Sequence, residues 1–222
     1  MRKNTLGICI AAVFCCTVMA VVDGIIQPAY VVKSAVKVVL FLLVPLALGT
    51  VCKLSLAETL RPDKAALLAG GCLGIATFGV VMGAYALLGS YIDLSAVPEA
   101  LAQNGGITRD NFLFVALYIA LCNSLLEEFF FRSFAFMGLL KTGAKAFAYL
   151  FSAAAFATYH AGMLIGMISV ELFVLALAAL FACGLLFNFL DARRERIWVS
   201  WLVHMGANLA INTVGMKLLG MF

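Results

Sequence analysis

Three short stretches of this 222-residue chain combine residue types that can carry out acid–base chemistry. In chain order they hold Glu127, Glu128 and Arg132, then Phe156 and His160, then His204 and Asn208. A carboxylate can accept a proton from water, and imidazole and amide groups can hydrogen-bond to a carbonyl oxygen on which negative charge develops. These side chains are sufficient to activate a water molecule and to stabilise an oxyanion, provided that the three stretches meet in space.

The three stretches lie inside apolar segments that are long enough to cross a membrane. The chain is 65% hydrophobic and 12% charged, whereas about a quarter of the residues in a soluble domain are charged. About 20 apolar residues cross a hydrocarbon core of ~30 Å, and seven segments qualify, at residues 5–22, 34–52, 65–88, 111–139, 145–163, 167–190 and 197–219. The sequence therefore predicts an all-α, polytopic bundle of about seven transmembrane helices, forming a single integral membrane domain over residues 1–222.

The basic residues near the ends of these segments predict how the bundle is oriented. Ten fall on one side, namely Arg2, Lys3, Lys53, Arg61, Lys64, Lys141, Lys145, Arg193, Arg194 and Arg196, and four on the other, namely Lys33, Lys37, Arg109 and Lys217. Cytoplasmic loops carry the excess of Lys and Arg, so we expect the N-terminus in the cytoplasm and the C-terminus outside. The net charge of +4 follows from these helix ends and predicts no nucleic-acid surface. The compact size and short loops favour a multi-pass protein of a bacterial plasma membrane.

The ionisable residues inside the spans require an explanation, because a charge at the bilayer centre costs roughly 2.5–3.5 kcal/mol on insertion scales. Arg132 follows Glu128 by four residues, the favourable order for an ion pair on a helix. Glu127 points about 100° away from Glu128, so we expect it to be protonated or paired with a group on another helix. Lys37, near the start of the second span, is expected to reach the interface. On this view Glu127→Gln leaves the fold intact, whereas Glu128→Gln leaves Arg132 unpaired.

The two histidines each share a helical face with a second residue one turn away, Phe156 with His160 and Asn208 with His204. Small residues surround both histidines and allow helices to approach closely. A single intramembrane His or Asn is often only a structural group worth about 0.6–2 kcal/mol, but the placement of all these groups in three helices favours a shared site. Glu127 and His160 lie ~20 Å and ~22 Å from the predicted cytoplasmic helix ends and His204 only ~10 Å, a mismatch of about 10 Å.

In this order, on separate apolar helices, the three motifs resemble those of the CPBP family, the CAAX-type proteases and bacteriocin-processing enzymes also called the Abi family. The resemblance covers about residues 111–215. It implies an intramembrane glutamic endopeptidase of eight or so helices, which cleaves a membrane-associated peptide or protein without a cofactor or metal. Its partners would be membrane lipid and the peptide substrate.

The resemblance also implies roles for the residues of the motifs. The catalytic residues would be Glu127, His160, His204 and Asn208, and the supporting residues Glu128, Arg132 and Phe156. The first two of the catalytic residues would position and deprotonate a water molecule, and the other two would hold the oxyanion. Because most bacteria have no evident prenylated proteins, a peptide or membrane-protein substrate is favoured over a prenylated tail.

Other functions remain open at this point. Two imidazoles and a carboxylate are a familiar catalytic zinc set, so His160, His204 and Glu127 could instead serve a membrane metalloprotease, although no HExxH motif occurs. A non-catalytic membrane protein, such as a bacteriocin-immunity protein or a proton-coupled carrier that uses Glu127, is a further alternative. The seven cysteines are odd in number and lack CxxC spacing, so we expect them to be small buried apolar residues.

Overall fold

The computed structural model describes residues 2–165 and 168–222, and within these residues it is an all-α bundle without strands. Seven long helical stretches are present, as the sequence predicts. They are α1 (Arg2–Val21) with η1 (Val22–Ile26); α2 (Tyr30–Val38), η2 (Val39–Leu43) and α3 (Val44–Val51); α5 (Lys64–Leu88) with η3 (Gly89–Tyr91); α7 (Phe112–Tyr118), η4 (Ile119–Asn123), α8 (Ser124–Glu128), η5 (Phe129–Met137) and α9 (Gly138–Leu140); α10 (Lys145–Leu164); α11 (Val170–Ala192); and α12 (Trp198–Leu218). The predicted start of the sixth span at residue 167 lies outside the described residues.

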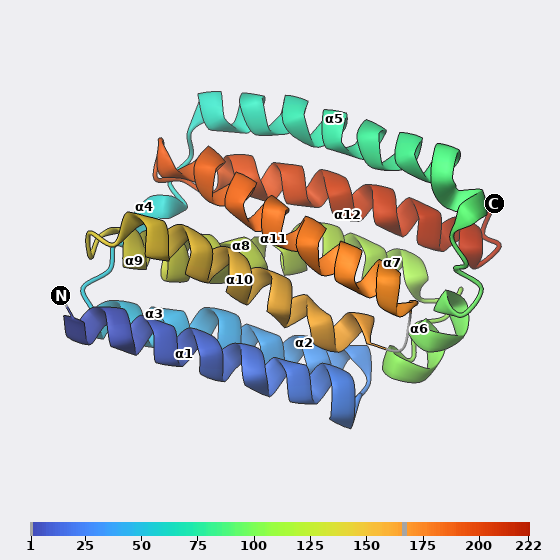
Figure 1. The fold of residues 1–222 in the computed structure, drawn as a ribbon, viewed down its shortest axis with the longest axis horizontal. Helices are drawn as coiled ribbons and strands as arrows, with labels where there is room; N and C mark the ends of the chain where they lie inside the picture. Colours follow the sequence, from blue (N-terminus) through green and yellow to red (C-terminus); the bar gives the residue numbers. More distant parts are fainter. Residues whose placement is uncertain (1, 166–167) are drawn as a thin grey trace.

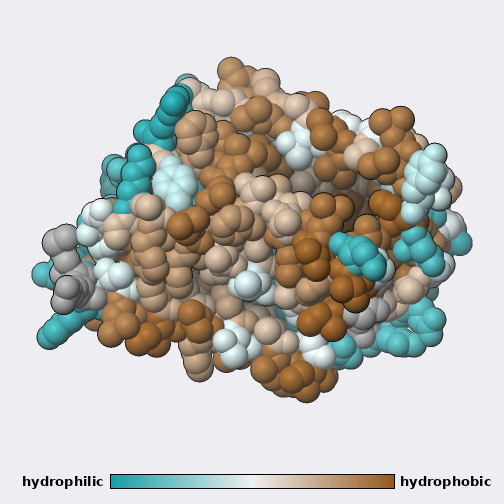
Figure 2. Space-filling model, in the orientation of Figure 1, coloured by the Kyte–Doolittle hydropathy of each residue, from teal (hydrophilic) through white to brown (hydrophobic). Residues whose placement is uncertain are grey.

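Five of these stretches in the described part of the chain are long and apolar enough to cross a membrane by length and composition. The other two, α10 with 20 residues and α12 with 21, carry His160 and the pair His204 and Asn208. On the face shown in Figure 2, hydrophilic side chains gather at the two ends of the molecule and apolar side chains cover most of the surface between them. The chain is therefore an all-α, multi-pass membrane bundle.

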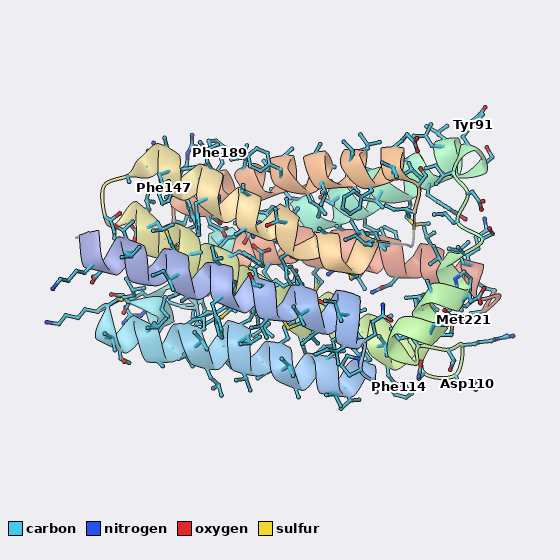
Figure 3. The ribbon with its side chains drawn as sticks, turned by 60° about the horizontal axis from the view of Figure 1, so that its bottom comes forward. Tyr91, Asp110, Phe114, Phe147, Phe189 and Met221 are labelled. Carbon is cyan, nitrogen blue, oxygen red and sulfur yellow. The ribbon has the colours of Figure 1, made fainter. Side chains whose placement is uncertain are left out.

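The long helices run side by side between the two ends of the molecule (Figure 1). The N-terminus, α9 and the α11–α12 connection lie at one end, and the C-terminus and α6 (Val97–Gly105) lie at the other. In Figure 3, Phe147 and Phe189 mark the first end, and Tyr91, Asp110 and Met221 mark the second. This arrangement gives the alternation of connections on which the predicted orientation depends. Lys37, however, is buried inside the bundle, so it does not belong among the four basic residues assigned to the outer side.

The helix that carries both glutamates is irregular. It runs without a break from Phe112 to Leu140, and α8 lies between two π-helical segments, η4 and η5. Such π segments are rare and are found frequently at functional sites. The other π segment in mid-span, η2, ends at Leu43, two residues before Pro45. Because proline lacks an N–H, a local π adjustment re-pairs the backbone groups that a membrane helix cannot leave exposed to lipid.

Stacked phenylalanines hold this irregular helix in place. Phe41 of η2 stacks on Phe130 of η5 with ring centroids 4.0 Å apart, and Phe131 packs edge-on against Phe156 of α10 at 5.3 Å. Every residue of η5 is buried.

The seven cysteines are all free, but Cys72, Cys122 and Cys183 are exposed rather than buried as expected, which is a correction to that prediction.

Helix α5 lies along α12 at one side of the bundle (Figure 1), and glycines bring the two backbones into direct contact. A Cβ at Gly74 would lie 2.5 Å from the carbonyl oxygen of Leu202, and a Cβ at Gly206 would overlap the carbonyl group of Gly74. Small residues allow this close packing between membrane helices. The contact fixes α12 two residues beyond His204.

We expect Gly206→Ala to lower the stability of the protein, because the added methyl group has no space against the Gly74 backbone. Overpacking of this kind costs typically about 1–3 kcal/mol, measured as a fall in the unfolding temperature in detergent. Gly79→Ala on α5 is the control, since nothing lies within 4 Å of its Cβ, and it should be at least as stable as the parent. Equal stability of the two variants would contradict the packing described here.

Candidate active site

The structure brings Glu127 of the first motif and both histidines together in the interior of the bundle. The Oε2 atom of Glu127 on α8 lies 3.6 Å from Nε2 of His160 on α10 and 3.7 Å from Nε2 of His204 on α12. The three residues are 2%, 9% and 7% exposed. Three helices that are separate in sequence thus present one carboxylate oxygen and two imidazole nitrogens to the same point.

The sequence predicted that His204 lies about 10 Å nearer the cytoplasmic helix ends than Glu127. The connection between α3 and α5 explains why the two residues nevertheless lie at the same depth. Its short helix α4 (Leu56–Thr59) folds against η5, where the Thr59 hydroxyl lies 2.5 Å from that of Ser133. The Thr59 carbonyl accepts a hydrogen bond of 3.2 Å from the Ile197 N–H, immediately before α12. Helix α12 therefore begins at the level of Ser133, roughly two turns deeper than the end of α9. The depth estimate failed because it placed all helix ends at one level.

Glu127 has a partner on another helix, and this partner is Lys37 of α2. The Lys37 ammonium lies 2.6 Å from Oε1 of Glu127 and 2.6 Å from Oδ1 of Asn123. The Asn123 amide donates to the same Oε1 at 2.9 Å. The expectation that Lys37 reaches the interface is therefore wrong, because its side chain is buried against Glu127. The expectation that Glu127→Gln leaves the fold intact loses its basis, since this change would leave Lys37 unpaired.

Both imidazoles are oriented by bonds to their other nitrogen. Nδ1 of His160 lies 2.7 Å from the Phe156 carbonyl oxygen, which can only accept, so this nitrogen carries the hydrogen. Nδ1 of His204 lies 2.8 Å from Oε1 of Glu128, and with an ionised carboxylate it is again the donor. In neutral rings, both Nε2 lone pairs then face Oε2 of Glu127. Glu128 thus contacts a catalytic candidate directly, a contact that the sequence did not predict.

The expected ion pair between Glu128 and Arg132 is present. Nε of Arg132 lies 3.1 Å from Oε2 of Glu128, and both side chains are fully buried. The guanidinium group lies near two aromatic rings, 4.3 Å from the centroid of Phe156 and 4.9 Å from that of Phe187. Its terminal nitrogens have no hydrogen-bond partner among the described residues. The ring faces and the carboxylate charge therefore stabilise this cation. Phe156 also packs edge-on against both imidazole rings.

Asn208 lies one turn beyond His204, and its hydrogen bond in the described residues goes to the backbone and not to Glu127. Its amide donates to the Ile119 carbonyl oxygen of η4 at 3.3 Å, and the amide of Asn212, one turn further on, donates to the Ala116 carbonyl at 2.9 Å. These bonds attach α12 to the helix of the glutamates. One N–H of the Asn208 amide remains available, because a primary amide has two.

Sequence alone assigned Lys37 no role in the site, and it could name Asn123 only as one of several possible supporting groups without placing it. Lys37 is an ionisable residue inside an apolar segment, which is the same signal that singled out Glu127, but its place near a helix end was explained by snorkelling. Asn123 precedes Glu127 by four residues and so lies on the same helix face. Sequence spacing could place Asn123 beside Glu127, but it could not show that α2 packs against α8.

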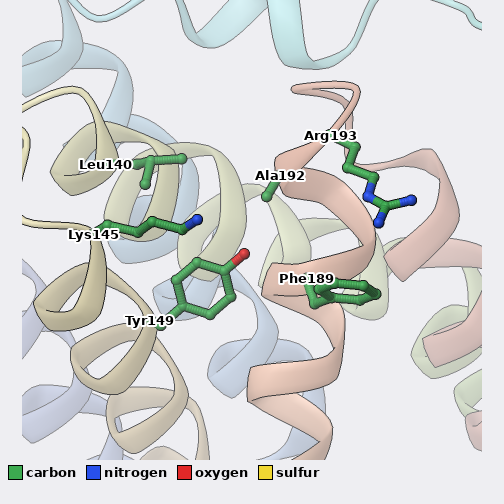
Figure 4. Close-up of a pocket in the computed structure, with 6 residues that line it drawn as sticks. All are labelled: Leu140, Lys145, Tyr149, Phe189, Ala192 and Arg193. Carbon is green, nitrogen blue, oxygen red and sulfur yellow. The ribbon is translucent and has the colours of Figure 1, made fainter.

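A cavity of about 410 Å³ lies elsewhere, at the end of the bundle that contains the N-terminus. It is lined by Leu140, Lys145, Tyr149, Phe189, Ala192 and Arg193 (Figure 4). None of the residues of the three motifs lines it. The Lys145 ammonium and the Tyr149 hydroxyl approach each other on one side of it, and Arg193 lies over the Phe189 ring at 5.3 Å on the other. The candidate site is therefore a packed cluster separate from this cavity.

Comparison with known protein families gives an independent identification of the segment that carries the motifs. Residues 109–210 match the model of the family described as type II CAAX prenyl endopeptidase Rce1-like. The match contains all three motifs and confirms the predicted family. It supports a membrane endopeptidase of the CAAX protease type. No curated protein and no solved structure matches the chain.

We expect Glu128→Gln to destabilise the protein, because it removes the carboxylate that both Arg132 and His204 contact. Breaking a buried ion pair costs roughly 3–5 kcal/mol, visible as a lower unfolding temperature in detergent. The double variant Glu128→Gln with Arg132→Gln should regain part of the loss, since no unpaired charge remains. Glu171→Gln, an exposed site on α11, is the matched control and should unfold like the parent. A stable Glu128→Gln single variant would show that the pair is not required.

Proposed function

We propose that the chain is an intramembrane endopeptidase that hydrolyses a peptide bond of a membrane-associated peptide or protein, with Glu127 as the general base. The observation that carries this proposal is the asymmetry of the Glu127 carboxylate. Lys37 and Asn123 occupy Oε1, whereas Oε2 has no hydrogen-bond partner in the described residues and faces two imidazole nitrogens. A carboxylate oxygen held in this way is ready to accept a proton.

Glu127 and His160 are suited to position the attacking water. A water molecule at Oε2 of Glu127 can donate one hydrogen to that oxygen and the other to Nε2 of His160, whose lone pair is directed there by the bond from Nδ1 to the Phe156 carbonyl. The water oxygen then attacks the scissile carbonyl carbon while one proton passes to Oε2. A positioned base of this kind contributes about 10²–10⁴-fold to the rate.

His204 and Asn208 are suited to stabilise the oxyanion that this attack creates. His204 donates from Nε2 when both ring nitrogens carry hydrogen, and the Glu128 carboxylate at Nδ1 balances the imidazolium charge. Asn208 contributes its second amide hydrogen from one turn further along α12. When the C–N bond breaks, the proton held by Glu127 passes to the leaving amine, and the products are a free carboxyl group and a free amine.

The burial of the site inside a bundle with an apolar surface favours a substrate that is itself associated with the membrane. We propose a peptide precursor or a membrane-anchored protein of a bacterial plasma membrane as the substrate. The test is incubation of the protein in lipid nanodiscs with membrane-anchored peptides, with and without a prenyl group, in H₂¹⁸O. A hydrolase yields products with ¹⁸O in the new carboxyl group. Absence of cleavage of every peptide would favour an immunity protein or a carrier.

We expect His204→Ala and Asn208→Ala each to reduce kcat by about 10²-fold or more, since one oxyanion donor is worth about 2.7–4 kcal/mol. KM should stay within a few-fold of the parent value, because the bond strengthens mainly in the transition state. Steady-state kinetics on one cleaved peptide provide the measurement. If either variant lost substrate binding but kept kcat, the oxyanion role would be wrong.

The alternative with a specific geometric basis is a zinc enzyme, because Glu127, His160 and His204 converge on one point. Among residues 2–165 and 168–222, no group of three His, Cys, Asp or Glu side chains is arranged to hold a metal ion. Because side chains supply the proposed base, the group that positions the water and the oxyanion donors, we expect prolonged treatment with a strong zinc chelator to leave the cleavage rate unchanged. Loss of activity that zinc restores, with stoichiometric zinc found by elemental analysis, would establish the metalloenzyme instead.

A further inference from the structure

Lys37 lies in α2, far outside residues 109–210 that match the endopeptidase family. We propose that Lys37 is a positioning residue of the active site, which holds one oxygen of Glu127 and thereby fixes the other as the base. The N-terminal helices are then part of the catalytic centre and not only a membrane anchor for it. This inference rests on the proposed function, in which Oε2 of Glu127 takes the proton.

The hydrogen bonds define which carboxylate oxygen can react. Lys37, Asn123 and Glu127 form a closed ring in which Lys37 donates to the other two residues at 2.6 Å each, and Asn123 donates to Glu127 at 2.9 Å. Two donors therefore converge on Oε1. Rotation of the carboxylate would break both bonds, so the ring keeps Oε2 directed at His160 and His204. Positioning within a fraction of an ångström is the main contribution that such supporting contacts make to catalysis.

The charges of the buried cluster give a second, independent reason for Lys37. Within the family-matched segment, Glu127 and Glu128 are adjacent carboxylates with a single buried cation, Arg132, bound to Glu128. In the resting site, in which both histidines are neutral and His204 has not yet been protonated to hold an oxyanion, this set carries one uncompensated negative charge in a low-dielectric interior, where such a charge is costly. Lys37 supplies the missing positive charge at Glu127 itself.

The structure also shows how the bundle keeps Lys37 in this position. The side chain is 7% exposed, and its ammonium lies 4.8 Å from the centroid of the Tyr159 ring and 5.6 Å from that of Phe41. Aromatic faces attract a cation at these distances. Tyr159 directly precedes His160 in α10. The Lys37 ammonium of α2 therefore contacts side chains of both α8 and α10.

The first test compares Lys37→Met, Lys37→Arg and a matched control in the peptide-cleavage assay. Lys37→Met should lower kcat by about 10²-fold with KM within a few-fold, since the loss of a positioned base is of that order. Lys37→Arg should recover part of kcat, because it restores the charge and a donor. The control is Lys33→Met, one turn earlier on α2 and paired with Asp23 at 3.2 Å, which should keep the parent kcat. Parent kcat in folded Lys37→Met would overturn the proposal.

The second test does not depend on proteolysis. Unfolding temperatures in detergent are compared for the parent, Lys37→Met, Glu127→Gln and the double variant. Each single change leaves one buried charge unpaired, so the double variant should unfold at a higher temperature than either single variant. If the parent cleaves no peptide, the proposed function fails while this cycle still decides whether the buried pair exists. Additive effects of the two changes would overturn the role of Lys37.

Discussion

The burial of two adjacent carboxylates in the middle of a membrane bundle is the constraint on which the rest of the structure depends. Both carboxylates are buried, and each is bound by one group of its own helical stretch and by one group of another helix. Arg132 and His204 contact Glu128, and Lys37 and Asn123 contact Glu127. These contacts join the helical stretches that contain α2, α8 and α12, and His160 of α10 adds a fourth at Oε2 of Glu127. The phenylalanines that pack between η2, η5 and α10 hold three of these stretches together, and the contact between Gly74 and Gly206 attaches α12 to α5.

Compensation of charge and preparation for catalysis are achieved by the same contacts. The groups that neutralise Glu127 all bind Oε1, and the oxygen left without a donor is the one that faces His160 and His204. The Glu128 carboxylate binds Nδ1 of His204, on the side of the ring away from Glu127. There it can balance the imidazolium charge while Nε2 binds an oxyanion. A preorganised arrangement of this kind costs no reorganisation during the reaction, because the fold fixes the dipoles and charges beforehand.

Much of this architecture follows from local rules that can be applied to sequence. Seven long apolar segments predicted the seven helical stretches, and the spacing of Glu128 and Arg132 predicted their ion pair. The family that the motifs resemble was confirmed by the match over residues 109–210. The catalytic roles of the motif residues stay predictions until kinetic measurements are made.

What the sequence could not give depends on contacts between distant segments. The pairing of Lys37 with Glu127 joins residues 90 positions apart, and no periodicity reveals which helix packs against α8. The depth of His204 depends on α4. Thr59 of α4 contacts Ser133 and accepts a hydrogen bond from Ile197, so α12 begins deeper in the bundle than the end of α9. The contact of Asn208 with a backbone carbonyl likewise follows from how α12 crosses η4. Each is a property of tertiary packing.

The central claim is that Glu127 accepts the proton of the attacking water, and the single-turnover cleavage rate of Glu127→Gln in nanodiscs tests it most directly. The measurement is made below the unfolding temperature of the variant, with the protein in excess of the peptide and at a concentration that saturates binding, so that neither stability nor affinity limits the rate. Because glutamine cannot accept the proton, the account predicts a rate at least about 10²-fold below that of the parent protein. A rate for folded Glu127→Gln within a few-fold of the parent would contradict it.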